Sequence, residues 1–357
     1  MTREKPRNLA ASVRQRLFNL AQERREDFGL VLAKYGLERF LYRLAQSQYR
    51  DQFILKGALL FELWTHRPYR PTRDLDLEGQ GDNSIARIKR LFFEIMTQAV
   101  DDDGLVFDPK SLRVARIKEE QEYEGLRANL VARLERARIH MQVDVGFGDV
   151  IVPAPKEIQY PTMLNFPRPH LRACPREAVV AEKLEALVKL GMANTRMKDF
   201  YDLWKLSHDF NFDGALLTDA IKSTFKRRGT DVPSDIPLAL PFSITTVEEG
   251  RFVDVNDAFE RRYGYSRNDL IGRNLSEVGP WDDPSELRRV VDEIRDRGAA
   301  HALTARLRKR SGETIDTIVF AETVDLDGRE CLLAISEDVP NQAGAHAYPT
   351  PKSASEH

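Results

Sequence analysis

Two short segments, residues 72–77 and 139–145, alternate polar and apolar side chains. A period of two is typical of a β-strand with one face in a hydrophobic core and the other in polar surroundings. Asp74 and Asp76 therefore point to the same face of the first strand, and Asp144 lies on the polar face of the second. The alternation predicts neighbouring strands that present carboxylates together.

Helices and further strands are expected around these two segments. The spacing of apolar residues predicts helices over 8–48 (two helices), 58–64, 85–100, 176–190, 197–207 and 213–227, and strands over 53–55, 112–117 and 126–134. The first part of the chain is therefore expected to be an α/β (α+β) domain with a mixed or antiparallel sheet. The following stretch, residues 227–237, contains Gly, Pro and Ser without periodicity, which is typical of a linker.

A chain of 357 residues is long enough for two domains. We place the boundary near residue 240, giving domains over 1–240 and 241–339 and a disordered tail over 340–357. Residues 1–240 hold 39 Lys and Arg against 34 Asp and Glu, and the remainder holds 15 against 22. This asymmetry points to an anionic partner for the first domain only.

Hydropathy and cysteine content indicate the cellular compartment in which the protein is expected. No run approaches the roughly 18 apolar residues that a membrane span needs, and the N-terminus lacks the apolar core of a signal peptide. The protein is expected to be cytoplasmic, with no membrane partner. Cys174 and Cys331 fall in different predicted domains, so neither a disulfide nor a cysteine-rich zinc site is expected.

The paired acids indicate metal-assisted chemistry. Carboxylates aimed at one point repel unless a cation joins them, and hard oxygen ligands suit Mg²⁺ shared with substrate phosphates. Two such ions would serve transfer of a nucleotide from a nucleoside triphosphate. Lys56 and Gly57, at a strand-to-helix turn, offer a cation and close backbone approach to the triphosphate. On its own, an Asp-x-Asp pair is more often a solvated strand end.

A second polar cluster lies in the predicted helices. Lys183 sits on or beside an apolar stripe, and Asp199 and Asp202 share one helix face because they are three residues apart. The pattern alone is explained more simply without a functional site. Lys183 would cover apolar surface with its stem, and Asp199 and Asp202 would lie on a solvated helix face.

Four segments in this order resemble the AbiEii/AbiGii toxin family, a branch of the DNA polymerase β-like nucleotidyltransferases. The resemblance covers roughly residues 10–240 and rests on Phe53-Ile54-Leu55-Lys56-Gly57, Pro71-Thr72-Arg73-Asp74-Leu75-Asp76-Leu77, Gln142-Val143-Asp144-Val145-Gly146-Phe147-Gly148-Asp149, and Val180-Ala181-Glu182-Lys183 with Met197-Lys198-Asp199-Phe200-Tyr201-Asp202-Leu203-Trp204. It implies a toxin that transfers a nucleotide to tRNA or another RNA. An antitoxin encoded nearby would neutralise this toxin.

The resemblance also implies roles for individual residues. Metal ligands would be Asp74, Asp76 and Asp144; catalytic residues would be these three with Lys183, Asp199 and Asp202; and nucleotide-binding residues would be Lys56, Gly57, Lys183 and Lys198. One departure is Ala58, which stands where the family favours a second Gly or Ser and so removes a hydroxyl donor.

Residues 241–339 resemble a PAS domain, an antiparallel sheet flanked by short helices. The resemblance rests on Gly250-Arg251-Phe252-Val253-Asp254-Val255-Asn256-Asp257-Ala258-Phe259, Tyr263-Gly264-Tyr265-Ser266, Asp269-Leu270-Ile271-Gly272-Arg273 and the turn Lys309-Arg310-Ser311-Gly312-Glu313. The cysteine of flavin-adduct photosensors is absent from Gly272-Arg273-Asn274-Leu275, and His301 alone does not indicate haem, so no PAS cofactor is predicted. Such a domain implies regulation, small-ligand sensing or homodimerisation.

Three hypotheses remain open from the sequence. The first is a PAS-regulated nucleotidyltransferase toxin acting on tRNA. The second keeps the chemistry but transfers the nucleotide to a small molecule or a protein hydroxyl. The third is a degenerate, non-enzymatic binding or sensor module, which only Ala58 favours.

Overall fold

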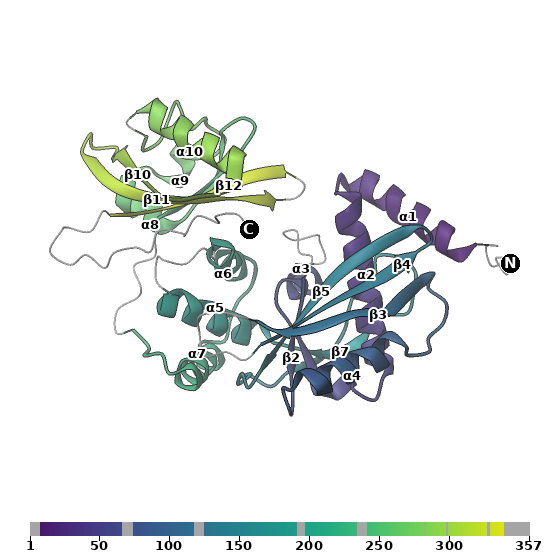
Figure 1. The fold of residues 1–357 in the computed structure, drawn as a ribbon. Coiled ribbons are helices and arrows are strands. Elements are labelled where there is room, and N and C mark those ends of the chain that lie inside the picture. Colours follow the sequence, from purple (N-terminus) through teal and green to yellow (C-terminus); the bar gives the residue numbers. More distant parts are fainter. Residues whose placement is uncertain are drawn as a thin grey trace, which may run out of the picture. The chain divides into compact units, whose positions relative to one another are not determined.

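The computed structural model describes residues 8–65, 74–117, 125–190, 197–233, 241–281, 283–297, 299–326 and 329–338. Contacts divide the chain into two compact units, residues 1–182 with 212–229 and residues 183–211 with 230–357. Each unit contains one β-sheet (Figure 1). Among the described residues, no helix is both long and apolar enough to cross a bilayer.

The sheet of the first unit has seven strands in the order β3-β4-β5-β2-β1-β7-β6. Its strands are β1 (Phe53–Lys56), β2 (Asp74–Gly79), β3 (Leu105–Arg116), β4 (Leu126–Leu134), β5 (Ala137–Phe147), β6 (Lys156–Gln159) and β7 (His170–Ala173). The pairs β2–β5 and β1–β7 are parallel, and the other neighbours are antiparallel. The predicted mixed sheet is thus confirmed.

The predicted helices of the first 240 residues are all present. They are α1 (Leu9–Arg24), α2 (Phe28–Gln46), α3 (Leu59–Thr65), α4 (Ile85–Met96), α5 (Arg176–Leu190), α6 (Met197–Asp209) and α7 (Gly214–Arg228), with a short 3-10 helix η1 (Arg50–Gln52). The Asn8 side chain caps α1 by accepting a hydrogen bond from the Ala11 amide. Asp213 caps α7 in the same way.

Helix α2 packs directly on β5 and fixes which face of the sheet is apolar. A Cβ built at Gly36 would lie 2.5 Å from Met141 Sδ, so the absence of a side chain at Gly36 lets α2 approach β5 with Met141 in its present position. Ile139, Met141 and Val143 of β5 are buried on the α2 side. The polar side chains of β5 therefore project from the opposite face of the sheet.

Some element boundaries differ from those predicted. Strand β3 begins at Leu105 instead of residue 112, because a register shift between Asp108 and Arg113 interrupts the alternation. Strands β6 and β7 were not predicted, since four residues carry too little periodicity. Helix α4 ends at Met96, where the Thr97 hydroxyl bonds back to the helix. Residues 66–73, 234–240 and 339–357 lie outside the described residues. They include the first three residues of the family motif at 71–77, the end of the predicted linker at 227–237 and the whole predicted tail at 340–357.

The second sheet has five antiparallel strands in the order β10-β11-β12-β8-β9. Its elements are β8 (Phe242–Thr246), β9 (Phe252–Val255), α8 (Asp257–Tyr263), α9 (Arg267–Leu270), α10 (Pro284–Arg297), β10 (Ala299–Arg308), β11 (Thr314–Leu326) and β12 (Arg329–Asp338). The predicted turn at 309–313 connects β10 and β11. The architecture is the predicted antiparallel sheet with short helices.

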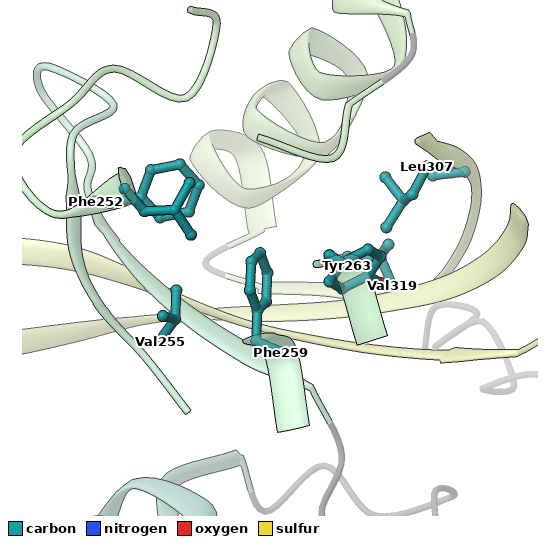
Figure 2. Packing of buried hydrophobic residues seen from close by; sticks show 8 residues of the cluster. Phe252, Val255, Phe259, Tyr263, Leu307 and Val319 are labelled. Atoms are coloured by element: carbon teal, nitrogen blue, oxygen red, sulfur yellow. The ribbon is translucent and has the colours of Figure 1, made fainter. Parts of the chain in front are cut away.

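Aromatic side chains form much of the core of this second sheet domain. Phe252, Phe259 and Tyr263 pack edge to face or tilted beside Leu307 and Val319 (Figure 2). Such ring pairs are favoured over stacked sandwiches because the ring edge is positive and the face negative. The core therefore fixes α8 on the sheet.

The two cysteines are free thiols. Cys174 and Cys331 are both buried and lie in different units. The side chain of His301 lies outside the described residues.

Candidate active site

One row of charged side chains crosses four neighbouring strands of the first sheet. The strand register pairs Lys56 of β1 with Asp76 of β2, Asp76 with Asp144 of β5, and Asp144 with Arg127 of β4. Residues directly opposite one another project from the same face, and Asp74 shares it because it lies two residues from Asp76. Asp74 and Asp76 of β2 and Asp144 of β5 thus lie on the same face of the sheet, opposite α2.

The turn after β1 lies against the middle of this row. Gly57 has a φ of 72°, a left-handed conformation that favours glycine. A Cβ built there would lie 1.9 Å from Asp76 Oδ2 and 2.8 Å from Asp76 Cβ. The backbone of the turn can approach the Asp76 carboxylate only because residue 57 has no side chain. The next residue, Ala58, is buried.

The third carboxylate is held by an arginine fork. Arg127 Nε lies 2.9 Å from Asp144 Oδ1 and Arg127 Nη2 lies 2.7 Å from Asp144 Oδ2, while Gln142 Nε2 donates to Oδ2 at 3.2 Å. Within the described residues, no group of three or more His, Cys, Asp and Glu side chains is already gathered as a metal site. Asp144 is thus beside Asp76 in the sheet but paired with Arg127.

Lys56 belongs to a buried set of charges that we name the Lys56 network: Lys56, Glu78, Asp149, Glu182 and Arg228. Lys56 Nζ lies 2.6 Å from Asp149 Oδ2, 2.9 Å from Glu182 Oε1 and 3.4 Å from Glu78 Oε2. Arg228 Nη2 lies 3.2 Å from Asp149 Oδ2, and the Asp149 amide donates to Glu78 Oε1 at 2.8 Å. The network joins β1, β2, α5, α7 and the loop after β5.

Burial and mutual charge displace the pKa values of this network. Burial lowers the pKa of Lys56, but Glu182, Asp149 and Glu78 outweigh it and hold that pKa well above its ordinary value. Burial raises the pKa of Glu78 from 4.5 to about 6, against the opposing charge of Lys56. Burial also raises the pKa of Asp149, but Lys56 and Arg228 bring it below its usual value. The Lys56 ammonium is thus charged throughout the working pH range.

Glu78→Gln tests this arrangement through the pH dependence of stability. Glu78 holds its proton up to a pH of about 6 in the folded protein and to 4.5 when unfolded. The folded state binds more protons in that window, so the free energy of unfolding falls as pH rises through it, by about 2 kcal/mol in total. Urea unfolding between pH 4 and 8 should show that Glu78→Gln removes this fall and is the more stable protein above pH 6.

The matched control is Glu23→Gln, at an exposed position of α1. It should leave the pH dependence of the wild type in place. A Glu78→Gln protein whose stability follows the wild-type pH curve would contradict the raised pKa.

The remaining predicted site residues lie in the second unit. Lys183 Nζ bridges Asp199 Oδ1 at 2.5 Å and Asp202 Oδ2 at 2.7 Å, and Asp202 is completely buried. The lysine and both aspartates therefore form one ion cluster between α5 and α6. Lys198 Nζ lies 2.7 Å from Glu322 Oε1 of β11. The predicted catalytic and nucleotide-binding roles of these residues stay predictions.

Several charged residues beside the predicted site carried no assigned role in the sequence. Glu78 continues the alternation of Asp74 and Asp76, so the period of two could have placed it on the same face. Arg127 and Arg228 carried no such signal, because their partners are distant in sequence and meet them only through strand pairing and helix packing.

Comparison with protein families covers both parts of the chain. Residues 39–272 match the family described as nucleotidyl transferase AbiEii toxin, type IV toxin–antitoxin system. Residues 241–340 match a PAS domain family. The two matches overlap over residues 241–272, which contain strands β8 and β9 of the five-stranded sheet and helices α8 and α9. No match to the chain was found among curated proteins.

Solved structures similar to the chain include several PAS and LOV domains. The PAS domain of an HTR-like protein from Haloarcula marismortui is 21% identical, with 28% of this chain and 81% of that chain covered and a TM-score of 0.25. The LOV domain of the blue-light activated histidine kinase EL346 from Erythrobacter litoralis is 23% identical, with 30% of this chain and 100% of that chain covered and a TM-score of 0.25.

The match over residues 39–272 spans well over half of the chain and includes every residue of the charged row. The chain belongs to the AbiEii family of nucleotidyl transferase toxins and carries a PAS domain over residues 241–340.

Proposed function

We propose that this protein is a Mg²⁺-dependent nucleotidyltransferase toxin that transfers a nucleotide from a nucleoside triphosphate to tRNA and is regulated by its PAS domain. The observation that carries the proposal is the register of β2 and β5, which pairs Asp76 with Asp144 and leaves Asp74 on the same face. Family membership supports the reaction class and an antitoxin as partner.

The side chains of the row suit a hard divalent cation. Asp74 and Asp76 offer oxygen ligands two residues apart on one strand face, and the turn at Gly57 leaves space only for a backbone against Asp76. We propose Asp74 and Asp76 as ligands, with Asp144 as the third once Arg127 releases it. Bound Mg²⁺ would polarise the reacting phosphate and stabilise the pyrophosphate that leaves.

The protein's own residues would orient the reactants. The left-handed turn at Gly57 would direct a backbone amide toward a phosphate oxygen. Lys56 is enclosed by three carboxylates, so its proposed contribution to triphosphate binding is to hold the Gly57 turn and the strands around it. We propose that Lys183 acts with Asp199 and Asp202 on the nucleotide or the acceptor.

The PAS domain offers a candidate site for a regulatory signal. A mainly apolar cavity in its core is bordered by Phe259, Trp281 and Leu332, and Tyr263 and Ser336 share a 2.6 Å hydrogen bond at its wall. The cavity is about 30 Å³, so a regulatory ligand of more than a few atoms would have to open the core. Homodimerisation through the PAS domain is the alternative mode of regulation.

Transfer from α-³²P-labelled nucleoside triphosphates to total tRNA tests the proposal. We expect labelled tRNA with Mg²⁺ and none with EDTA. Labelling of a small molecule or protein instead of RNA would keep the chemistry and change the acceptor. No labelling of any acceptor, together with no Mg²⁺-dependent triphosphate binding in calorimetry, would favour a non-enzymatic module.

Gly57→Ala should impair transfer by displacing Asp76. The new methyl group would meet the Cβ as well as the Oδ2 of Asp76, so the whole side chain must move. A shift of about 1 Å in a catalytic group can cost roughly a hundredfold in rate, and we expect a loss of that order. Gly214→Ala is the control, because a Cβ there meets nothing within 4 Å. Equal initial rates for the two variants would contradict the close approach.

A further inference from the structure

The Arg127–Asp144 pair lies at one end of the charged row. Strand order β4-β5-β2 places Arg127, Asp144 and Asp76 side by side, with Asp144 between the arginine and the other acid. Neighbouring strands are about 4.8 Å apart. A cation that joined Asp76 and Asp144 would therefore lie close to the Arg127 guanidinium.

The Arg127–Asp144 pair combines two hydrogen bonds with unequal exposure of its two side chains. Its two parallel N–H···O bonds reach both oxygens of Asp144, a bidentate, charge-assisted geometry that is stronger than a neutral hydrogen bond. Yet the Arg127 side chain is 42% exposed, whereas that of Asp144 is 18% exposed. The more exposed Arg127 is therefore the member of the pair that can move with less change to the core, while the backbone of Asp144 is held in the sheet.

We infer that Arg127 is a positioning residue that occupies Asp144 until a metal–nucleotide complex arrives, and then turns from Asp144 to the triphosphate. The inference rests on the proposed function. A guanidinium fork matches phosphate as well as carboxylate, so the same side chain can exchange one partner for the other. Free divalent cation then binds weakly, and nucleotide strengthens its binding.

Coulomb's law gives the size of the change in metal affinity that the Arg127 charge should cause. A unit charge about 5 Å from a divalent ion changes its affinity on the order of tenfold, even at the dielectric constant of water. Arg127→Gln should therefore bind Mn²⁺ alone about tenfold more tightly than the wild type. The variant should also lose most of the strengthening by nucleotide, because the two ligands are coupled through Arg127.

The experiment is a Mn²⁺ titration of the full chain followed by electron paramagnetic resonance. It is run without nucleotide and with the α,β-methylene analogues of the four ribonucleoside triphosphates, each in turn. Arg133→Gln is the matched control, because it removes the same charge from the same strand about 20 Å away along β4. It should leave both affinities unchanged.

Arg127→Lys separates charge from geometry. Lysine keeps the positive charge but lacks the planar fork, so free Mn²⁺ should bind as weakly as in the wild type while the nucleotide effect falls. Arg127→Gln that binds free Mn²⁺ no more tightly than the wild type would overturn the inference and leave the proposed metal site standing. A wild type that binds no Mn²⁺ even with nucleotide would overturn both.

Discussion

Lys56→Met is expected to destabilise the first unit by about 3–5 kcal/mol. The substitution keeps most of the apolar stem but removes the ammonium that lies within 3.4 Å of Glu78, Asp149 and Glu182. Breaking a buried ion pair leaves an uncompensated charge, which costs about that much. Arg228 would be the remaining cation of the Lys56 network.

Urea unfolding at pH 7 measures this loss. The two units can unfold in separate transitions, so each transition is compared with its wild-type counterpart. Lys89→Met, at an exposed position of α4, is the control and should change stability by less than about 0.5 kcal/mol. The loss in Lys56→Met should shrink toward pH 4, as the abandoned carboxylates take up protons. A loss below about 1 kcal/mol at pH 7 would show that Lys56 is not a structural cation.

Asp76→Asn is expected to reduce nucleotide transfer on the order of a thousandfold. Asparagine keeps the size of the side chain against Gly57 but removes the charge at the centre of the row. Loss of one preorganised electrostatic group in an active site costs about two to three orders of magnitude in rate. Asp74→Ala should have a comparable effect, because Asp74 shares the same strand face.

Initial rates of labelled transfer to tRNA measure the effect at saturating Mg²⁺ and nucleoside triphosphate. Asp219→Asn makes the same chemical change at an exposed position of α7 and should retain wild-type activity. Asp76→Asn should keep the unfolding curve of the wild type within about 1 kcal/mol, which separates chemistry from folding. Transfer that persists within tenfold of the wild type would remove Asp76 from the site.

Lys56 and Asp76 lie on the same face of the sheet but are expected to have different roles. Lys56 and Asp76 are opposite one another in the sheet, yet Lys56 is enclosed by carboxylates whereas the Asp76 side chain lies against the backbone of the Gly57 turn. A loss of stability is therefore expected from the first change and a loss of catalysis from the second. Measuring both quantities for both variants tests whether the sheet face divides this way.

Local pattern in the sequence was enough to place each acid on a strand face and to locate most helices. The period of two put Asp74 and Asp76 on one side of β2 and Asp144 on the polar side of β5. Such patterns are readable because they depend on residues two to four positions apart. Strands β6 and β7 were not predicted, because four residues contain too few repeats to show a period.

Only the tertiary structure decided which strands became neighbours, in which direction and in which register. The parallel pairing of β2 with β5 brought Asp144 beside Asp76, and the antiparallel pairing of β4 with β5 brought Arg127 onto Asp144. Closure of the chain around β1 enclosed Lys56 among acids. These contacts join residues far apart in the chain, so packing of the whole sheet determines them and no local repeat records them.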